Sequence, residues 1–115
     1  MNINYKLHVE NHKDLYDLTM NPTIQKMTSI TGDTRKIASA AIYEDVKATG
    51  EVVKILSFKD AENGEIFATN SPTFIRDFEN IRDMLAEFGE EPHTIKIESG
   101  TSRAGRPFIT CVYVD

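Results

Sequence analysis

The sequence predicts a mainly β protein with one central helix. Apolar and polar residues alternate over several short segments, the pattern of strands with one buried face, and only residues 72–88 show a sustained helical period. The length of 115 residues suits one hydrophobic core. We therefore expect one compact domain, in which residues 37–115 form the main fold and residues 1–36 form an N-terminal extension.

The N-terminal extension is expected to contain one strand and one short helix. Apolar residues alternate with polar ones from Ile3 to Val9. Asn11 can then cap a helix, which has to end before Pro22. Residues 23–34 mix Ser, Thr and Gly with isolated apolar residues, so we expect an irregular strand or loop there.

Residues 37–69 predict three consecutive strands, at 37–46, 51–58 and 65–69. Asn63 and Gly64 separate the second strand from the third, and this pair readily adopts the positive φ angles of a tight hairpin. Such a hairpin places Phe58 opposite Phe67, which favours packing of the two rings against each other.

The central helix has clear start and stop signals. Ser71 can accept backbone N–H groups of the first turn, Pro72 suits the first helical position, and Gly89 can end the helix. Five apolar residues at steps of four and three predict one stripe facing the core: Phe74, Phe78, Ile81, Leu85 and Phe88.

The last part of the chain predicts a second hairpin, with a polar loop between two strands. In its second strand, Ile109, Cys111 and Tyr113 share one face and Phe108 lies on the other. From residue 37 the order is therefore β-β-β-α-β-β, which is typical of the five-stranded OB-fold barrel. An α+β sheet with one covering helix is the alternative. Residues 1–36 would add a strand and a helix, or serve to form a homodimer or higher oligomer.

Charge is unevenly distributed along the chain. The net charge is -5, from 13 Lys+Arg and 18 Asp+Glu, yet residues 99–114 contain no acid. This balance argues against a duplex DNA binder and leaves room for a local nucleic-acid face. There is one cysteine, no long apolar run and no signal-peptide pattern, so we expect a cytoplasmic protein with no membrane partner.

Nothing in the sequence predicts an enzyme, a metal site or a cofactor. Cys111 falls at a core position of its strand, where a thiol is unreactive. His8, His12 and His93 have no cysteine cluster beside them. His8 and His12 are four residues apart, but we expect them to lie across a strand end and a helix start, where they would not share a metal face.

Three segments of residues 50–114 carry a resemblance to a known family. They are GEVVKILSF (50–58), ATNSPTF (68–74) and GTSRAGRPF (100–108). In these segments the chain resembles the small single-stranded-DNA-binding proteins of phages and plasmids of Gram-positive bacteria. The resemblance implies an OB-type domain in replication or recombination of a mobile element, with single-stranded DNA as partner. Single-stranded RNA is the alternative partner. The chain ends on a strand and not on an acidic tail, which weakens the expectation of replication proteins as further partners.

The best candidate for a nucleic-acid site is the loop at residues 99–108. Arg103 and Arg106 are expected to contact phosphates, and Phe108 to stack on a base. In OB-folds the loop between the last two strands is a main contact with oligonucleotides. Further candidates, where aromatic and basic residues alternate, are Tyr43, Phe58, Lys54, Lys59 and Lys96.

An alternative function belongs to a different class of protein. Six acids gather between residues 77 and 91, on the back of the predicted helix. Such a surface would suit a small acidic inhibitor or adaptor that binds a host protein.

Overall fold

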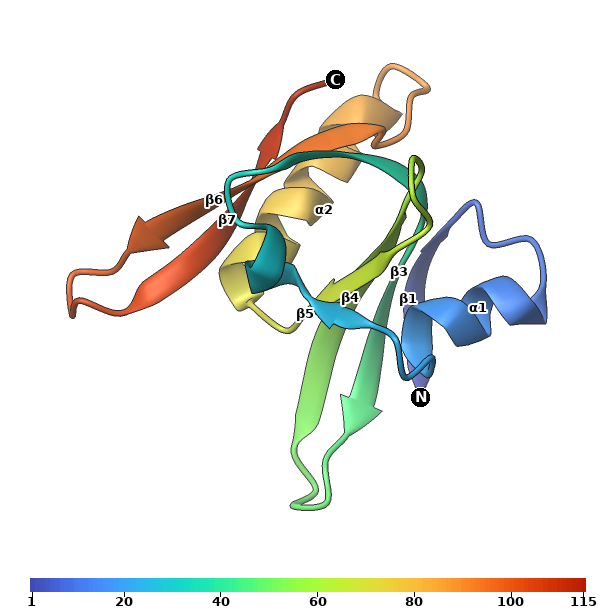
Figure 1. Cartoon of the computed structure of the whole chain (residues 1–115), viewed down its shortest axis with the longest axis horizontal. Coiled ribbons are helices and arrows are strands. Elements are labelled where there is room, and N and C mark those ends of the chain that lie inside the picture. Colours follow the sequence, from blue (N-terminus) through green and yellow to red (C-terminus); the bar gives the residue numbers. More distant parts are fainter.

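A curled sheet of seven strands forms the body of the molecule, seen in a computed structural model that describes all residues from 1 to 115 (Figure 1). Two α-helices and a single 3-10 turn complete the fold, so the expected mainly β class is confirmed. The elements are β1 (Asn2–Leu7), α1 (His12–Thr19), β2 (Gln25–Lys26), η1 (Met27–Ile30), β3 (Thr34–Val46), β4 (Val52–Asp60), β5 (Ile66–Thr69), α2 (Pro72–Ala86), β6 (Thr94–Thr101) and β7 (Pro107–Tyr113).

The long strand β3 organises the sheet. Its first residues pair with β6, and the rest pairs with β4 along one edge and with β1 along the other. The resulting order is β2-β5-β4-β3-β6-β7, with β1 attached to β3. Every pairing is antiparallel except the short one between β2 and β5. Because no pairing joins β5 to β7, the sheet has the form of a half-barrel with an open side.

The N-terminal segment adds a strand and a covering helix to this sheet. Asn11 caps α1 as expected, because its side-chain oxygen accepts a hydrogen bond from the Asp14 N–H at 2.9 Å. Leu18 of α1 packs on Ala41 and Tyr43, on the face of β3 that points away from the main core. Residues 23–34 form β2 and η1, whose Met27 and Ile30 are buried in the main core.

The helix α2 covers the concave side of the sheet. Ser71 caps it by accepting a hydrogen bond from the Phe74 N–H at 3.4 Å, and Pro72 is its first residue. Four of the five residues of the expected stripe are buried: Phe74, Phe78, Ile81 and Leu85. With 15 residues α2 is the longest helix, and no helix is both long and apolar enough to cross a bilayer.

Phe88 does not continue the stripe, and its expected core position is wrong. The N–H of Phe88 bonds to the carbonyl of Leu85, three residues back, so the last turn tightens and rotates the chain out of the helical period. Gly89 then adopts a positive φ of 69°. As a result the Phe88 side chain is 73% exposed.

The turn between β4 and β5 also differs from the expected two-residue hairpin. Lys59 pairs with Ile66, and only Gly64 adopts a positive φ, so the loop is longer. The buried Asp60 carboxylate accepts hydrogen bonds from the N–H groups of Glu62 and Asn63, which replaces the tight turn. The expected ring pair is confirmed, because Phe58 is directly opposite Phe67.

Candidate nucleic-acid interface

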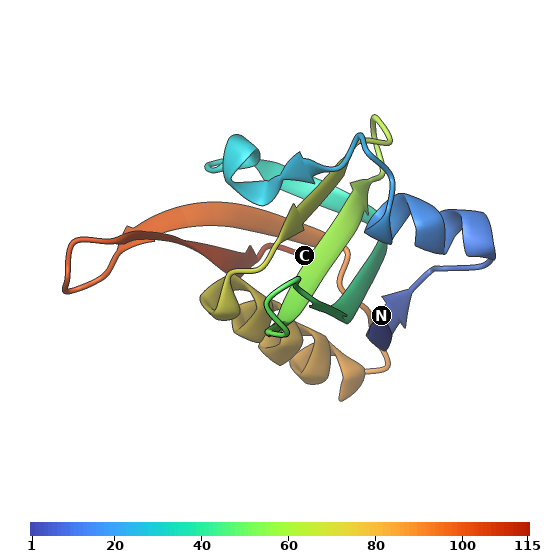
Figure 2. The same cartoon turned by 90° about the horizontal axis from the view of Figure 1, so that it is seen from below.

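Two hairpin arms extend from the half-barrel (Figures 1 and 2). We call the tip of the β3–β4 hairpin, residues 45–52, the first arm, and the tip of the β6–β7 hairpin, residues 99–108, the second arm. The turn of the second arm is held by its own hydrogen bonds. The Ser102 N–H donates to the Arg106 carbonyl at 2.8 Å, and the Ser102 hydroxyl accepts from the Arg106 N–H at 3.1 Å.

Arg103 and Arg106 lie at the tip of the second arm, where the sequence predicted a phosphate contact. Both side chains are exposed. Neither guanidinium forms an ion pair or a side-chain hydrogen bond, while Arg35 and Arg82 both pair with carboxylates. The two arginines therefore present unneutralised charge at a projecting point of the molecule, a suitable arrangement for binding an anion.

Phe108 lies at the base of the second arm on its outer face. Its neighbours Ile109 and Cys111 are buried, whereas Phe108 is only half-buried, as the alternation of the strand predicts. The ring covers Gly100 on β6, which is its direct partner across the hairpin. Part of the ring surface is therefore accessible to solvent, two residues along the chain from Arg106.

The open side of the half-barrel is a hollowed surface that we call the seam. Two hollows adjoin here, because Thr28, Thr69 and Asn70 line both of them. One reaches from β5 to β7, and the other lies over β2, η1, β4 and β5. Pro107 and Phe108, at the base of the second arm, form one border of the seam. Six side-chain hydroxyls line it, those of Thr28, Thr31, Thr69, Ser71, Thr73 and Ser99.

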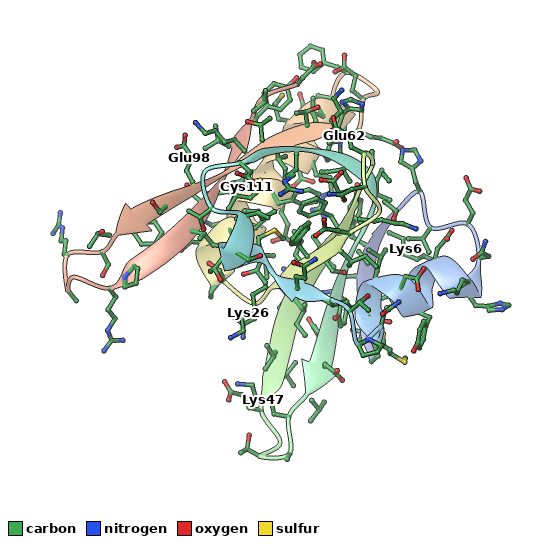
Figure 3. The ribbon with its side chains drawn as sticks, in the orientation of Figure 1. Lys6, Lys26, Lys47, Glu62, Glu98 and Cys111 are labelled. Atoms are coloured by element: carbon green, nitrogen blue, oxygen red, sulfur yellow. The ribbon has the colours of Figure 1, made fainter.

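The seam differs in charge from the rest of the protein. No Asp or Glu lines either hollow, although the chain has 18 acids and a net charge of -5. The one charged residue of the lining is Lys26, which is exposed and forms no ion pair. Figure 3 shows the Lys26 side chain pointing away from β2. A polyanion in the seam would therefore meet hydroxyls and one ammonium group, and the two arginines of the arm lie beyond its border. Glu98, which pairs with Lys96, lines a further hollow that shares Thr31 and Ser99 with the seam.

The structure corrects the assignment of two aromatic residues to this interface. Tyr43 is only 4% exposed, because α1 packs over its face of β3. Burial, with a smaller contribution from Asp45, raises the pKa of its hydroxyl. Phe58 is fully buried, with its ring centroid 5.7 Å from that of Phe67. Neither ring can stack on a nucleobase.

The three lysines predicted for the interface do not line the seam either. Lys54 Nζ is 2.8 Å from a Glu79 carboxylate oxygen, and Lys96 Nζ is 3.2 Å from one of Glu98. Both charges are therefore largely neutralised. Lys59 lies on β4 near Asp17 of α1. No local pattern marks Lys26 or Asn70 as interface residues, because both lie in short segments without apolar periodicity.

No group of three or more His, Cys, Asp and Glu side chains could hold a metal ion. The lone cysteine is also poorly placed for chemistry. Burial, with a smaller contribution from the Asp77 carboxylate, raises the pKa of the Cys111 thiol to about 12. The thiol is therefore protonated at neutral pH, and a thiolate is the form that reacts. In Figure 3, Cys111 lies within the body, while Glu98 lies at the outer side of β6.

Comparison of the chain with protein-family models, with curated proteins and with solved structures gives no match.

Proposed function

We propose that the protein binds single-stranded nucleic acid, with single-stranded DNA as its ligand, along the seam and the second arm. The observation that carries this proposal is the lining of the seam, which contains no acid, at the base of an arm whose residues 99–108 also contain none, in a protein with a net charge of -5. In this proposal the protein shields single strands during replication or recombination of a phage or another mobile element, as the sequence resemblance implies.

The strand order and the position of α2 support the interpretation of the main fold as OB-like. From residue 37 the strands follow the order β5-β4-β3-β6-β7, and the single helix α2 lies between β5 and β6. The OB barrel is itself partly open and binds its ligand on the barrel face and on the adjoining loops. Here the seam occupies the place where a pairing of β5 with β7 would close a barrel. The missing pairing thus leaves room for a ligand.

The mechanism divides between phosphates and bases. Arg103, Arg106 and Lys26 would neutralise phosphates, which gives affinity without sequence preference. The hydroxyls of the seam and the Asn70 amide would donate hydrogen bonds to phosphates or to base edges. Phe108 would stack on one base at the border of the seam. In this mechanism the nucleic acid displaces water from the seam and is bound without being chemically changed.

A titration with a fluorescent oligonucleotide tests the proposal. Wild-type protein should raise the anisotropy of a labelled single strand at low salt, and should bind the matching duplex more weakly. Asn70→Asp places a carboxylate in the seam and should abolish binding, whereas Asn80→Asp adds the same charge on the exposed side of α2 and should not. A flat titration with DNA and with RNA single strands would contradict the proposal.

The alternative function, an acidic adaptor that uses the back of α2, has weaker support. Three of its acids have partners within the molecule. Glu79 pairs with Lys54, Asp83 pairs with Arg82 at 2.9 Å, and Asp77 accepts a hydrogen bond from the Cys111 N–H. The Asp77 and Glu79 carboxylates connect α2 to β7 and β4, and Asp83 is engaged within α2, so at least half of the six acids already have a partner.

A further inference from the structure

The C-terminal end of α2 carries an exposed apolar group that the proposed function does not use. Phe88 is 73% exposed and Met84 is 42% exposed. Glu87 and Glu90 flank them, and neither carboxylate forms an ion pair. We call these four residues the knob. Together, Phe88 and Met84 present apolar surface that no part of the molecule covers.

A groove of opposite character lies at the other end of the same helix. It is formed between the first arm and the N-terminal half of α2, and its apolar lining includes Val52, Pro72 and Ile75. Val52 is 59% exposed. We call it the helix–arm groove. Its remaining lining residues are Lys47, Glu51, Val53, Lys54, Asn70, Arg76 and Glu79.

The net charge of the helix–arm groove is positive. Lys47 pairs with Glu51 at 3.8 Å, and Lys54 pairs with Glu79 at 2.8 Å. The guanidinium of Arg76 is then left exposed and without an ion pair. An apolar group with an adjacent carboxylate is the kind of ligand that such a groove accepts, and the knob presents both.

The knob cannot reach the groove of its own molecule. The two sites lie at opposite ends of α2, whose 15 residues span about 22 Å at 1.5 Å per residue. Figures 1 and 2 both show the two ends of α2 well separated along the molecule. Two complementary surfaces that cannot meet within one molecule can only meet between two copies of it.

We propose that a second copy of this chain is the occupant of the helix–arm groove, and that its Phe88 inserts between Val52 and Pro72 while Glu87 or Glu90 meets Arg76. The contact is heterologous, because the two surfaces differ. A pair of copies then still presents one unused knob and one unused groove, so assembly continues into a ring or an open row. This inference rests on α2 and the first arm. Asn70 and Pro72 line both the helix–arm groove and the seam, so the two sites adjoin, but assembly does not require nucleic acid.

Sedimentation velocity over a range of protein concentrations tests the contact. The wild-type protein should change from the 13.0 kDa monomer to larger species as the concentration rises, and added salt should reverse the change. Phe88→Ser and Arg76→Glu should each keep the protein monomeric. Because both side chains are exposed, the thermal melts of the two variants should match the wild type. Matched controls are Met20→Ser and Lys6→Glu, which alter exposed residues elsewhere and should assemble as the wild type does.

A mixture of the two variants gives the decisive result. Phe88→Ser keeps an intact groove and Arg76→Glu keeps an intact knob, so an equal mixture should form a 1:1 dimer that cannot grow. A mixture that stays monomeric would overturn the proposal, and so would a wild-type protein that stays monomeric or single variants that assemble normally. The double variant Arg103→Ala/Arg106→Ala should assemble as the wild type does. Its behaviour separates this proposal from the proposed function.

Discussion

The Phe108 ring lies over Gly100, its direct partner across the β6–β7 hairpin. A Cβ atom added to Gly100 would lie 2.6 Å from Cζ of the ring, so the ring fills the space that a side chain would occupy. Aromatic residues often cover a strand glycine in this way, because the glycine offers no side chain to pack against. The contact holds Phe108 on the outer face of the second arm, beside the seam.

Replacing Gly100 should move this ring. Gly100 has no positive φ, so its backbone accepts alanine, and Gly100→Ala should push the ring away without unfolding the arm. We expect a change in oligonucleotide affinity with little change in melting temperature. Fluorescence anisotropy and a thermal melt on the same sample measure both. An affinity identical to that of the wild type would mean that the position of the ring does not matter for binding.

Truncation of Phe108 tests stacking directly. Phe108→Ala should lose about 1–3 kcal/mol of affinity for a single strand, the contribution of one stacked base. Phe108→Tyr should keep most of the affinity because the aromatic face remains. The opposite pattern, a large drop in melting temperature with unchanged affinity per folded molecule, would show that the ring is needed only for packing.

The two arginines of the second arm should determine the salt dependence. If both contact phosphates, Arg103→Ala/Arg106→Ala should lower the slope of log affinity against log salt by roughly 1.4, at about 0.7 per contact on single strands. The loss should be similar for all base sequences. Lys6→Ala/Lys36→Ala removes two exposed charges elsewhere and serves as the control. An unchanged slope would exclude the arm from the interface.

Truncating an apolar residue of α2 should lower the unfolding free energy far more in the middle of the stripe than at its C-terminal end. Phe78 is fully buried in the main core, so Phe78→Ala should cost about 3–5 kcal/mol of unfolding free energy. Phe88→Ala should change it by no more than about 0.5 kcal/mol, as surface substitutions do. Urea denaturation of both variants measures the difference. Equal losses would mean that Phe88 is buried in solution.

The ion pair between Arg35 and Asp60 should make stability depend on acid pH. The atoms are 2.9 Å apart, and Asp60 is buried. Burial alone would raise the pKa of the Asp60 carboxyl, but hydrogen bonds from Arg35 and from the N–H groups of Glu62 and Asn63 hold that pKa below its ordinary value. A carboxyl with a lowered folded-state pKa stabilises the protein above its unfolded pKa of about 3.9 and loses that contribution as pH falls through the folded value.

Asp60→Asn should therefore destabilise the protein at pH 7 by about 1.5–3 kcal/mol, the contribution of a hydrogen bond to a charged group, since Arg35 keeps Asp33 as its other partner. The difference from wild type should shrink as pH falls below about 4, because the unfolded wild-type chain then takes up the Asp60 proton and the folded chain follows at lower pH. Urea denaturation at pH 7 and pH 3 measures the unfolding free energies. Asp33→Asn, which changes the exposed partner of the same arginine, should lower the unfolding free energy much less. A difference that stays constant with pH would contradict this role for Asp60.

The sequence by itself determined the features that depend on near neighbours. The cap at Ser71 and the first turn of α2 need only residues within one turn. The alternation of β7 places the Phe108 side chain on one face of the strand and those of Ile109 and Cys111 on the other, whatever packs against the strand. The basic turn with Arg103 and Arg106 is likewise a property of one short segment. These predictions did not require knowing where the rest of the chain lies.

The tertiary structure decided which of these faces are open. Tyr43 lies on a strand face that alternation alone leaves exposed, and it is buried because α1, far away in the sequence, packs over it. The end of α2 exposes Phe88 because a tightened last turn breaks the helical period. Lys26 and Asn70 meet at the seam only because β2 pairs with β5 and β7 stays apart from both. Burial and proximity depend on contacts between segments distant in sequence, and no local pattern specifies which segments will meet.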